Sequence, residues 1–199
     1  DAGSATSIAG KSPPRQAWAR PLAAAPGERF AYDNALLGLL SALIEHVAGM
    51  PLPDYARTEL VQPLGLAEPG YGRQLHLRTQ DMARLGQLFL QQGRWGERQL
   101  LPRDYVAQAT SVQAKGGPPV SMPYGYLWWI LPNEAPRRTF MASGYAGQMI
   151  WVHPPLELVV ATTSAISADS QRRGHSLEML RGGLVEAAQA RHQPPRATR

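Results

Sequence analysis

The stretch FMASGYAGQMIWVHPPLELVVATTS, residues 140–164, carries the pattern that decides the fold class. Residues 140–143, continuing through 149–152, are predicted to form one β-strand, and residues 156–163 the next. The short His153-Pro154-Pro155 link between them favours an antiparallel hairpin. Upstream, YGYLWWIL at 124–131 predicts a third strand of the same meander.

Helical patterns precede and follow these strands. The apolar run at 34–48 covers most of a helix circumference, which predicts a buried helix that ends at Gly49. Further helices are expected at 53–61, at 80–92 after an N-cap at Thr79, at 102–109 and at 173–190. The last one carries Leu177, Leu180, Leu184 and Ala188 on one face, enough to cover a sheet. Helices followed by a meander and a covering helix predict an α+β fold.

The composition narrows the class of protein. A chain of 199 residues with 44% hydrophobic residues is long and apolar enough to build one domain with a sizeable core. It has no cysteine, which excludes disulfides, thiolate metal sites and cysteine nucleophiles. The longest apolar run, at 35–44, is half of the roughly 20 residues that span a bilayer, so no membrane span is expected.

Two further site types are not supported by the residue patterns. The net charge of +5 comes from arginines that are scattered singly or in pairs, with no basic stripe and no nucleic-acid motif, so a solvated surface is favoured over a nucleic-acid partner. The five histidines show no metal-ligand spacing, and no dinucleotide or phosphate-binding loop is present. No metal or other cofactor is therefore expected.

A Tyr-x-Asn triplet, Tyr32-Asp33-Asn34, stands directly before the apolar helix. On these residues alone two interpretations compete. Tyr32 could pack on the leucine-rich helix while Asn34 caps its N-terminus. Alternatively, the phenol and the carboxamide could belong to a reactive site.

Three ordered segments favour the second interpretation. PGERFAYDN at 26–34, RTQDMARLGQLFLQQGRWGERQLLPRDYV at 78–106 followed by YGYLWWI, and the stretch from 140 to 164 resemble the second half of serine β-lactamase and penicillin-binding-protein-like hydrolases. That superfamily includes class C β-lactamases, D-alanyl-D-alanine carboxypeptidases, β-lactamase-like esterases and 6-aminohexanoate-dimer hydrolases. The resemblance covers roughly residues 18–187 and is nearest to the esterases and the dimer hydrolases.

The resemblance implies roles for the triplet. In the family, Tyr-x-Asn places a phenol and a carboxamide beside a nucleophilic serine. A free phenol, with a pKa of about 10, is a poor base at neutral pH, but next to a lysine ammonium it can relay protons. By resemblance, Tyr32 is the proton shuttle and Asn34 donates a hydrogen bond to the substrate.

The resemblance also assigns the segment Ala142-Ser143-Gly144, which lies where the family carries Lys-Thr-Gly or a degenerate version. Gly144 lets the substrate approach the strand edge, and Ser143 can hydrogen-bond to it. The backbone N–H of Tyr145 is implied as half of the oxyanion hole. Ala142 departs from the pattern because a methyl group cannot pair with a substrate carboxylate, which shifts the expected substrates toward esters and linear amides.

A larger departure is the absence of Ser-x-x-Lys, the family's nucleophile motif. The chain has two lysines; Ile8 stands three residues before Lys11 and Val112 three before Lys115. Ser7 and Ser111 stand four residues before these lysines, one position too far for Ser-x-x-Lys. We therefore expect the chain to be the C-terminal portion of a longer protein that carries the motif upstream.

Three interpretations of function stay open at this point. The protein is a serine hydrolase of esters or amides, a catalytically silent relative that binds a peptide-like or acylated ligand, or a domain that shares only the architecture. Residues 1–190 are expected to form one portion of a domain, with a loop at 1–17, a mostly helical region at 18–123, strands and the covering helix at 124–190, and a flexible tail at 191–199. The resemblance leans toward a periplasmic location.

Overall fold

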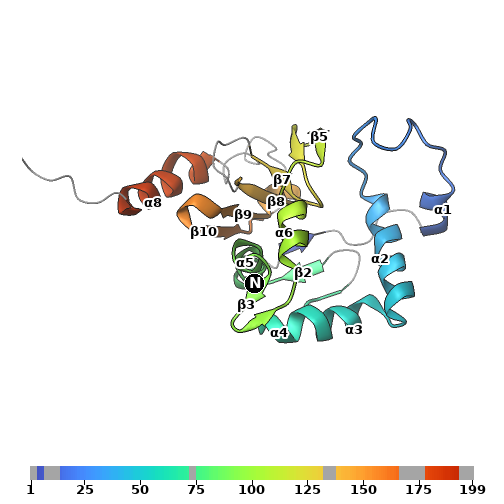
Figure 1. Cartoon of the computed structure of the whole chain (residues 1–199), viewed down its shortest axis with the longest axis horizontal. Coiled ribbons are helices and arrows are strands. Elements are labelled where there is room, and N and C mark those ends of the chain that lie inside the picture. The colour runs from blue at the N-terminus through green and yellow to red at the C-terminus, as the bar shows by residue number, and fades with distance from the viewer. Residues whose placement is uncertain (1–3, 7–13, 72–74, 132–137, 166–177, 193–199) are drawn as a thin grey trace, which may run out of the picture.

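The large sheet of the protein is an antiparallel meander of six strands. The computed structural model describes residues 4–6, 14–71, 75–131, 138–165 and 178–192. Within them the sheet order is β10-β9-β8-β7-β6-β5, so that each strand pairs with its sequence neighbour (Figure 1). The strands are β5 Ala114–Gly117, β6 Met122–Tyr124, β7 Trp129–Ile130, β8 Phe140–Ser143, β9 Met149–His153 and β10 Leu158–Thr162.

The hairpin around Pro154-Pro155 is confirmed, but the expected long strand at 140–152 is wrong. β9 pairs with β10 across a short 3-10 turn, η3 Pro154–Leu156. Residues 140–152 form two strands, because a second 3-10 turn, η2 Tyr145–Gly147, reverses the chain and pairs Ser143 with Met149. The sheet also begins earlier than expected, at Ala114 rather than Tyr124.

All the described helices except the C-terminal one precede the large sheet in the sequence, and α5 packs directly against its strands (Figure 1). They are α1 Pro14–Trp18, α2 Ala35–Ala48, α3 Leu52–Ala56, a π-helical turn η1 Arg57–Val61, α4 Gln62–Leu64, α5 Thr79–Leu90 and α6 Arg103–Ala109. Two small sheets join the α+β arrangement: β1 Ser4–Thr6 with β2 Leu75–Leu77, and β3 Arg94–Trp95 with β4 Arg98–Gln99. Residues 4–6 and 14–18 are therefore regular elements rather than the expected loop.

Side chains alternate between the two faces of the large sheet, as the pleat requires. One face carries Trp128, Ile130, Phe140, Ile150 and Val152, which pack with Met82, Leu85 and Phe89 of α5. The opposite face carries Trp129, Leu131, Met141, Met149 and Trp151, which pack with Leu180. Both faces are buried, which explains why these strands are apolar almost throughout.

The C-terminal helix covers the second face in a different way from the expected one. Its described part comprises a π-helical turn, η5 Leu180–Leu184, and α8 Val185–His192. Leu180 is fully buried and Val185 packs beside it, whereas Leu184 is exposed. The π turn holds one residue more than an α-helical turn, and Val185 rather than Leu184 joins Leu180 on the buried face. Leu177 lies outside the described residues.

Helix α2 is not buried all round, in contrast to the expectation. Gly49 ends it in the left-handed conformation as predicted, with φ at 67°. However, a stripe of Leu36, Leu40, Leu43 and Val47 is exposed. The described elements that pack extensively on α2 are α1 and α3, so this outward stripe is left uncovered. No single helix of the described part is long and apolar enough to cross a bilayer; the bent pair 36–48 and 52–64 passes that test by length and composition alone.

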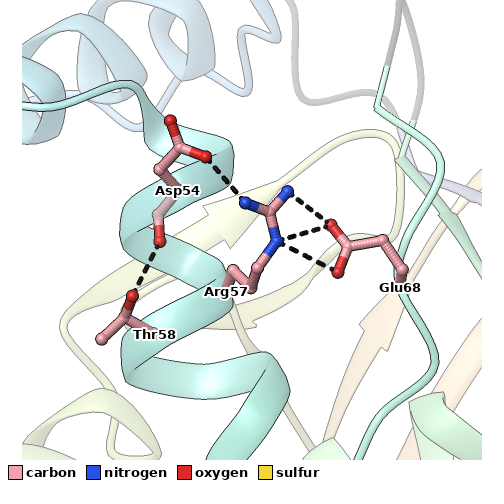
Figure 2. A network of polar contacts seen from close by, with 4 residues as sticks. All are labelled: Asp54, Arg57, Thr58 and Glu68. Atoms are coloured by element: carbon pink, nitrogen blue, oxygen red, sulfur yellow. Dashed lines mark hydrogen bonds and ion pairs between the residues drawn. The ribbon is translucent and has the colours of Figure 1, made fainter.

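Polar contacts hold the helical region together. Figure 2 shows the guanidinium of Arg57 between Asp54, at 2.8 Å, and Glu68, at 2.9 Å. These groups are partly exposed, so the contact contributes little free energy but fixes the chain after α4 beside the helix. At the start of α5, Asp81 is buried and accepts hydrogen bonds from Arg78 and from the backbone N–H of Ala67. The helix begins after Arg78 as N-cap, so Thr79 is its first residue rather than its expected cap.

Gly86 sets the distance between α5 and the sheet, and its replacement tests that packing. A Cβ at this position would lie 2.7 Å from Val159 and 2.8 Å from Ile150. Gly86→Ala is therefore expected to lower the free energy of unfolding by about 1–3 kcal/mol, although alanine favours helix. The matched control is Gly183→Ala, where a Cβ meets nothing within 4 Å; it should leave stability unchanged or raise it by up to about 1 kcal/mol. Urea unfolding measures both, and equal effects would contradict the packing argument.

Candidate active site

A cleft of about 480 Å³ separates the start of α2 from the large sheet. Its walls come from residues 30–34, from α2, from β2 and α5, and from the ends of β8 and β9. Four of the five site residues expected from the sequence line it: Tyr32, Asn34, Ser143 and Gly144. Residues distant in the sequence are thus brought to one concave surface, which is where ligands usually bind.

Tyr32 is held by an aromatic wall that also comprises Phe30, Tyr124 and Trp129. Its ring stacks on buried Trp129, with centroids 5.7 Å apart, and meets Tyr124 edge-on at 6.2 Å. Phe30 contacts the same two rings from the preceding turn of the chain. Aromatic pairs of this geometry add specific attraction to the burial of their surface. The ring of Tyr32 therefore has a fixed place although 39% of the side chain remains exposed.

Asn34 lies at the N-cap position of α2, but its side chain does not act as a cap. Its backbone is helical, and its carbonyl oxygen accepts a hydrogen bond from Leu37 N–H at 3.2 Å. The carboxamide makes no capping hydrogen bond, so it can serve the cleft that it lines. Next to it, Asp33 pairs with Arg20 at 2.6 Å, which ties the triplet to the chain after α1.

Ser143 and Gly144 lie where β8 ends and the η2 turn begins. Gly144 N–H donates to the Gln148 carbonyl oxygen at 2.7 Å, which closes the β8–β9 hairpin. A Cβ on Gly144 would lie 3.2 Å from the Gln148 side chain, so a larger residue would crowd the turn. Within the turn Ala146 has φ at 59°, a conformation that non-glycine residues rarely adopt. This strained turn sets the end of the strand edge that faces the cleft.

Gln148 is a site residue that the sequence analysis missed. It lines the cleft yet is buried, and its side chain exchanges two hydrogen bonds with the backbone of Ser164, at 2.6 and 3.3 Å. Thr162 adds a hydroxyl donation to the Gly147 carbonyl at 2.9 Å, and the Ser164 hydroxyl donates to that of Ala146. Thr162 at the end of β10 and Ser164 just after it thus hold the η2 turn in place through hydrogen bonds. The signal in the sequence was a single amide side chain within an apolar run.

Tyr145 stands apart from the other four site residues. It begins the η2 turn directly after Gly144, but its side chain is 57% exposed and it is not among the residues that line the cleft. Of the lysines, Lys115 lies exposed in β5 and also does not line the cleft, and Lys11 lies outside the described residues.

Comparison with known proteins identifies the family that carries this arrangement. The sequence model of the beta-lactamase family matches residues 7–180. The chain belongs to the beta-lactamase family. No curated protein matches the sequence at a significant level.

Solved structures of beta-lactamase-like proteins share the fold. A protein assigned as a 6-aminohexanoate-dimer hydrolase from Bacillus anthracis aligns with a TM-score of 0.68 at 24% identity, over 88% of this chain and 48% of its own. A protein assigned as a beta-lactamase from Bacteroides dorei aligns with a TM-score of 0.69 at 17% identity, over 88% of this chain and 63% of its own. A penicillin-binding protein from Bacillus halodurans aligns with a TM-score of 0.66 at 17% identity, over 87% of this chain and 65% of its own. The chain thus spans between about half and two thirds of the length of these structures.

The beta-lactamase-family cleft of this chain holds few charges. Of the residues that line it, Asp33 carries the one carboxylate, and none is a lysine, arginine or histidine. Burial, and to a lesser degree the charge of Tyr32, raise the pKa of Tyr124 to about 12, so Tyr124 keeps its proton at neutral pH. Ala142 contributes a methyl group to the strand edge. Among the described residues, no group of three His, Cys, Asp or Glu side chains could hold a metal ion.

The raised pKa of Tyr124 makes a prediction about stability at high pH. An unfolded tyrosine titrates near pH 10, whereas Tyr124 titrates at about 12 in the folded chain. Between these values the native state binds more protons than the unfolded state, so the free energy of unfolding should fall as the pH rises from about 10 to 12.

Tyr124→Phe should remove the part of this loss of stability that Tyr124 causes. The free energy of unfolding, obtained from urea unfolding at pH 8 and pH 11, measures the loss. Tyr32→Phe should reduce that part without abolishing it, because burial contributes more to the shift than the charge of Tyr32. An identical pH dependence in the wild type and in Tyr124→Phe would contradict the assignment.

Proposed function

We propose that the protein is a serine hydrolase of esters or amides that works through an acyl-enzyme, with a nucleophile outside these 199 residues. The observation that carries the proposal is the convergence of Tyr32 and Asn34 with Ser143 and Gly144 on one cleft of a beta-lactamase-family fold. In the reaction, the serine Oγ bonds to the acyl carbon, the leaving alcohol or amine takes up a proton, and water then releases the acid.

Tyr32 is proposed as the group that relays this proton. A phenol needs a neighbouring cation to serve near neutral pH, and the lysine of Ser-x-x-Lys would supply it. The aromatic wall supports the role, because stacking on Trp129 and edge contact with Tyr124 hold the ring in one orientation. A fixed orientation is what proton transfer requires, since the donor and acceptor must come within hydrogen-bond distance.

The substrate is proposed to lie along the end of β8. The carboxamide of Asn34 and the hydroxyl of Ser143 would bind it, and Gly144 would let it come close to the backbone. The backbone N–H of Tyr145, together with that of the nucleophile, is proposed to stabilise the oxyanion. This role belongs to the backbone and does not require the Tyr145 side chain to line the cleft.

We propose that the segment that carries the nucleophile binds on the apolar part of the cleft. Leu36 and Leu40 of α2 line it, opposite Leu77 and Met82. The same leucines belong to the uncovered stripe of α2, and burying such a stripe is favourable by about 25 cal/mol per Å². A helix that carries Ser-x-x-Lys on this surface would place its serine near Tyr32.

Neutral substrates suit this cleft better than anionic ones. Ala142 replaces the family's lysine, and no basic side chain lines the cleft, so nothing there would pair with a substrate carboxylate. We therefore propose esters and linear amides. The alternative, a catalytically silent relative that binds a peptide-like or acylated ligand, is favoured by one observation, the absence of Ser-x-x-Lys from these residues.

Replacement of the Tyr32 hydroxyl tests the proton relay. In the protein that carries Ser-x-x-Lys, Tyr32→Phe is expected to lower kcat for p-nitrophenyl esters by about 10²–10⁴-fold, the usual worth of a positioned acid–base group. KM and Tm should change little, because the ring contacts remain. Tyr55→Phe on α3, equally exposed at 39% and outside the cleft, is the matched control. Equal activity of both variants would rule Tyr32 out of the chemistry.

The isolated chain tests where the nucleophile lies. The 199 residues alone should neither hydrolyse p-nitrophenyl esters nor react with a fluorophosphonate, because their sequence contains no Ser-x-x-Lys. Mass spectrometry after incubation with the probe measures this. Covalent labelling of Ser143 or of any other serine would show that the nucleophile lies within this chain.

A further inference from the structure

A second cavity, of about 440 Å³, lies against α6, and we name it the α6 pocket. It is formed by α6, by the start of β8 and by the turn after β9. None of its lining residues also lines the cleft. β8 connects the two cavities, since Phe140 at its first position faces the α6 pocket and Ser143 at its last position faces the cleft.

The base of the α6 pocket is apolar. Val106, Phe140 and Pro154 contribute to its lining, and all three are buried. Phe140 is further held by the ring of Trp128, with centroids 5.0 Å apart. The base therefore belongs to the packed core and offers a preformed surface to the apolar part of a ligand.

Two guanidinium groups lie on the rim of the α6 pocket. Arg103 is the first residue of α6, and Arg138 precedes β8, so the fold brings together two cations that are far apart in the sequence. Neither forms an ion pair with any residue that the structure describes, whereas Arg57 and Arg84 are each held by a carboxylate. Guanidinium groups that no described carboxylate pairs with are suited to bind the carboxylate of a ligand.

The remaining polar groups restrict how a ligand could bind. Thr110 and Ser111 line the pocket, but their hydroxyl groups already donate to the carbonyl oxygens of Val106 at 2.8 Å and Gln108 at 2.9 Å. The guanidinium groups are therefore the strongest donors for an anion. Asp104 also lines the pocket, and its negative charge would weaken the binding of an anion.

We propose that the α6 pocket binds a small organic carboxylate, with the carboxylate group at Arg103 and Arg138 and the apolar body against Val106, Phe140 and Pro154. This binding is separate from the proposed catalysis, because it uses none of the cleft residues.

Titration of the ¹⁵N-labelled chain with hexanoate, followed by NMR, tests the proposal. We expect a dissociation constant of about 1–10 mM, as suits a partly exposed site with two charged contacts. Shifts should concentrate on the backbone amides of Ala107, Thr110 and Phe140. Hexanol, which lacks the charge, and inorganic phosphate, which lacks the apolar body, should each bind at least about fivefold more weakly. Shifts confined to the cleft, or equal affinity for hexanol, would overturn the proposal.

Variants separate a site from general charge attraction. Arg103→Ala combined with Arg138→Ala should weaken hexanoate binding by about 5- to 10-fold. The matched control, Arg15→Ala combined with Arg98→Ala, removes the same charge from exposed positions outside the pocket and should leave affinity unchanged. Asp104→Asn should strengthen binding. Equal losses in the two double variants, or weaker binding in Asp104→Asn, would contradict the proposal; circular dichroism checks that each variant is folded.

Discussion

The placement of the cleft depends on one buried carboxylate, that of Asp81. It accepts hydrogen bonds from Arg78 at 2.8 Å and from Ala67 N–H at 3.3 Å, and it pairs with Arg84 at 3.0 Å. Arg84 in turn donates to the Gly65 carbonyl at 2.6 Å. Burial alone would raise the pKa of Asp81, but these hydrogen bonds and charges outweigh it and hold the pKa below its ordinary value. The carboxylate is therefore charged at neutral pH. It joins the segment directly after α4, residues 65–67, to the start of α5.

From α5 the constraint continues to the strand edge. Gly86 lets α5 approach β9 and β10 so closely that a methyl group would not fit. The end of β10 holds the η2 turn through Gln148, and this turn fixes Gly144. On the other side of the cleft, α2 packs on α3, which leads to the segment that Asp81 binds. The two halves of the proposed site are thus related through these packed elements and through the contact of Tyr32 with Trp129 and Tyr124 of the large sheet.

Much of this arrangement could be predicted from the sequence, and the failures have physical causes. Strong periodicity identified α2, α5 and the β9–β10 hairpin within a few residues. The break after Ser143 was missed although Gly144 and Gly147 are turn signals, because the apolar residues on both sides were interpreted as one continuous strand. β5 was missed because its residues, Ala-Lys-Gly-Gly, have low strand propensity and are kept in the sheet by pairing with β6. Four of the five site residues predicted from family motifs line the cleft, whereas the contacts of Gln148 depend on Ser164 and so appear only in three dimensions.

The aromatic wall gives a physical reason why Tyr32, rather than Tyr124, suits a proton relay. Both phenols line the cleft, and their rings lie 6.2 Å apart. Burial, and to a lesser degree the charge of Tyr32, raise the pKa of Tyr124 to about 12, so Tyr124 is held neutral. A neutral and fixed Tyr124 can orient its neighbour without competing for the proton. Tyr32 is more exposed and stacks on Trp129 with its ring. The two phenols therefore differ in burial, and the more exposed one, Tyr32, is the one proposed for the proton relay.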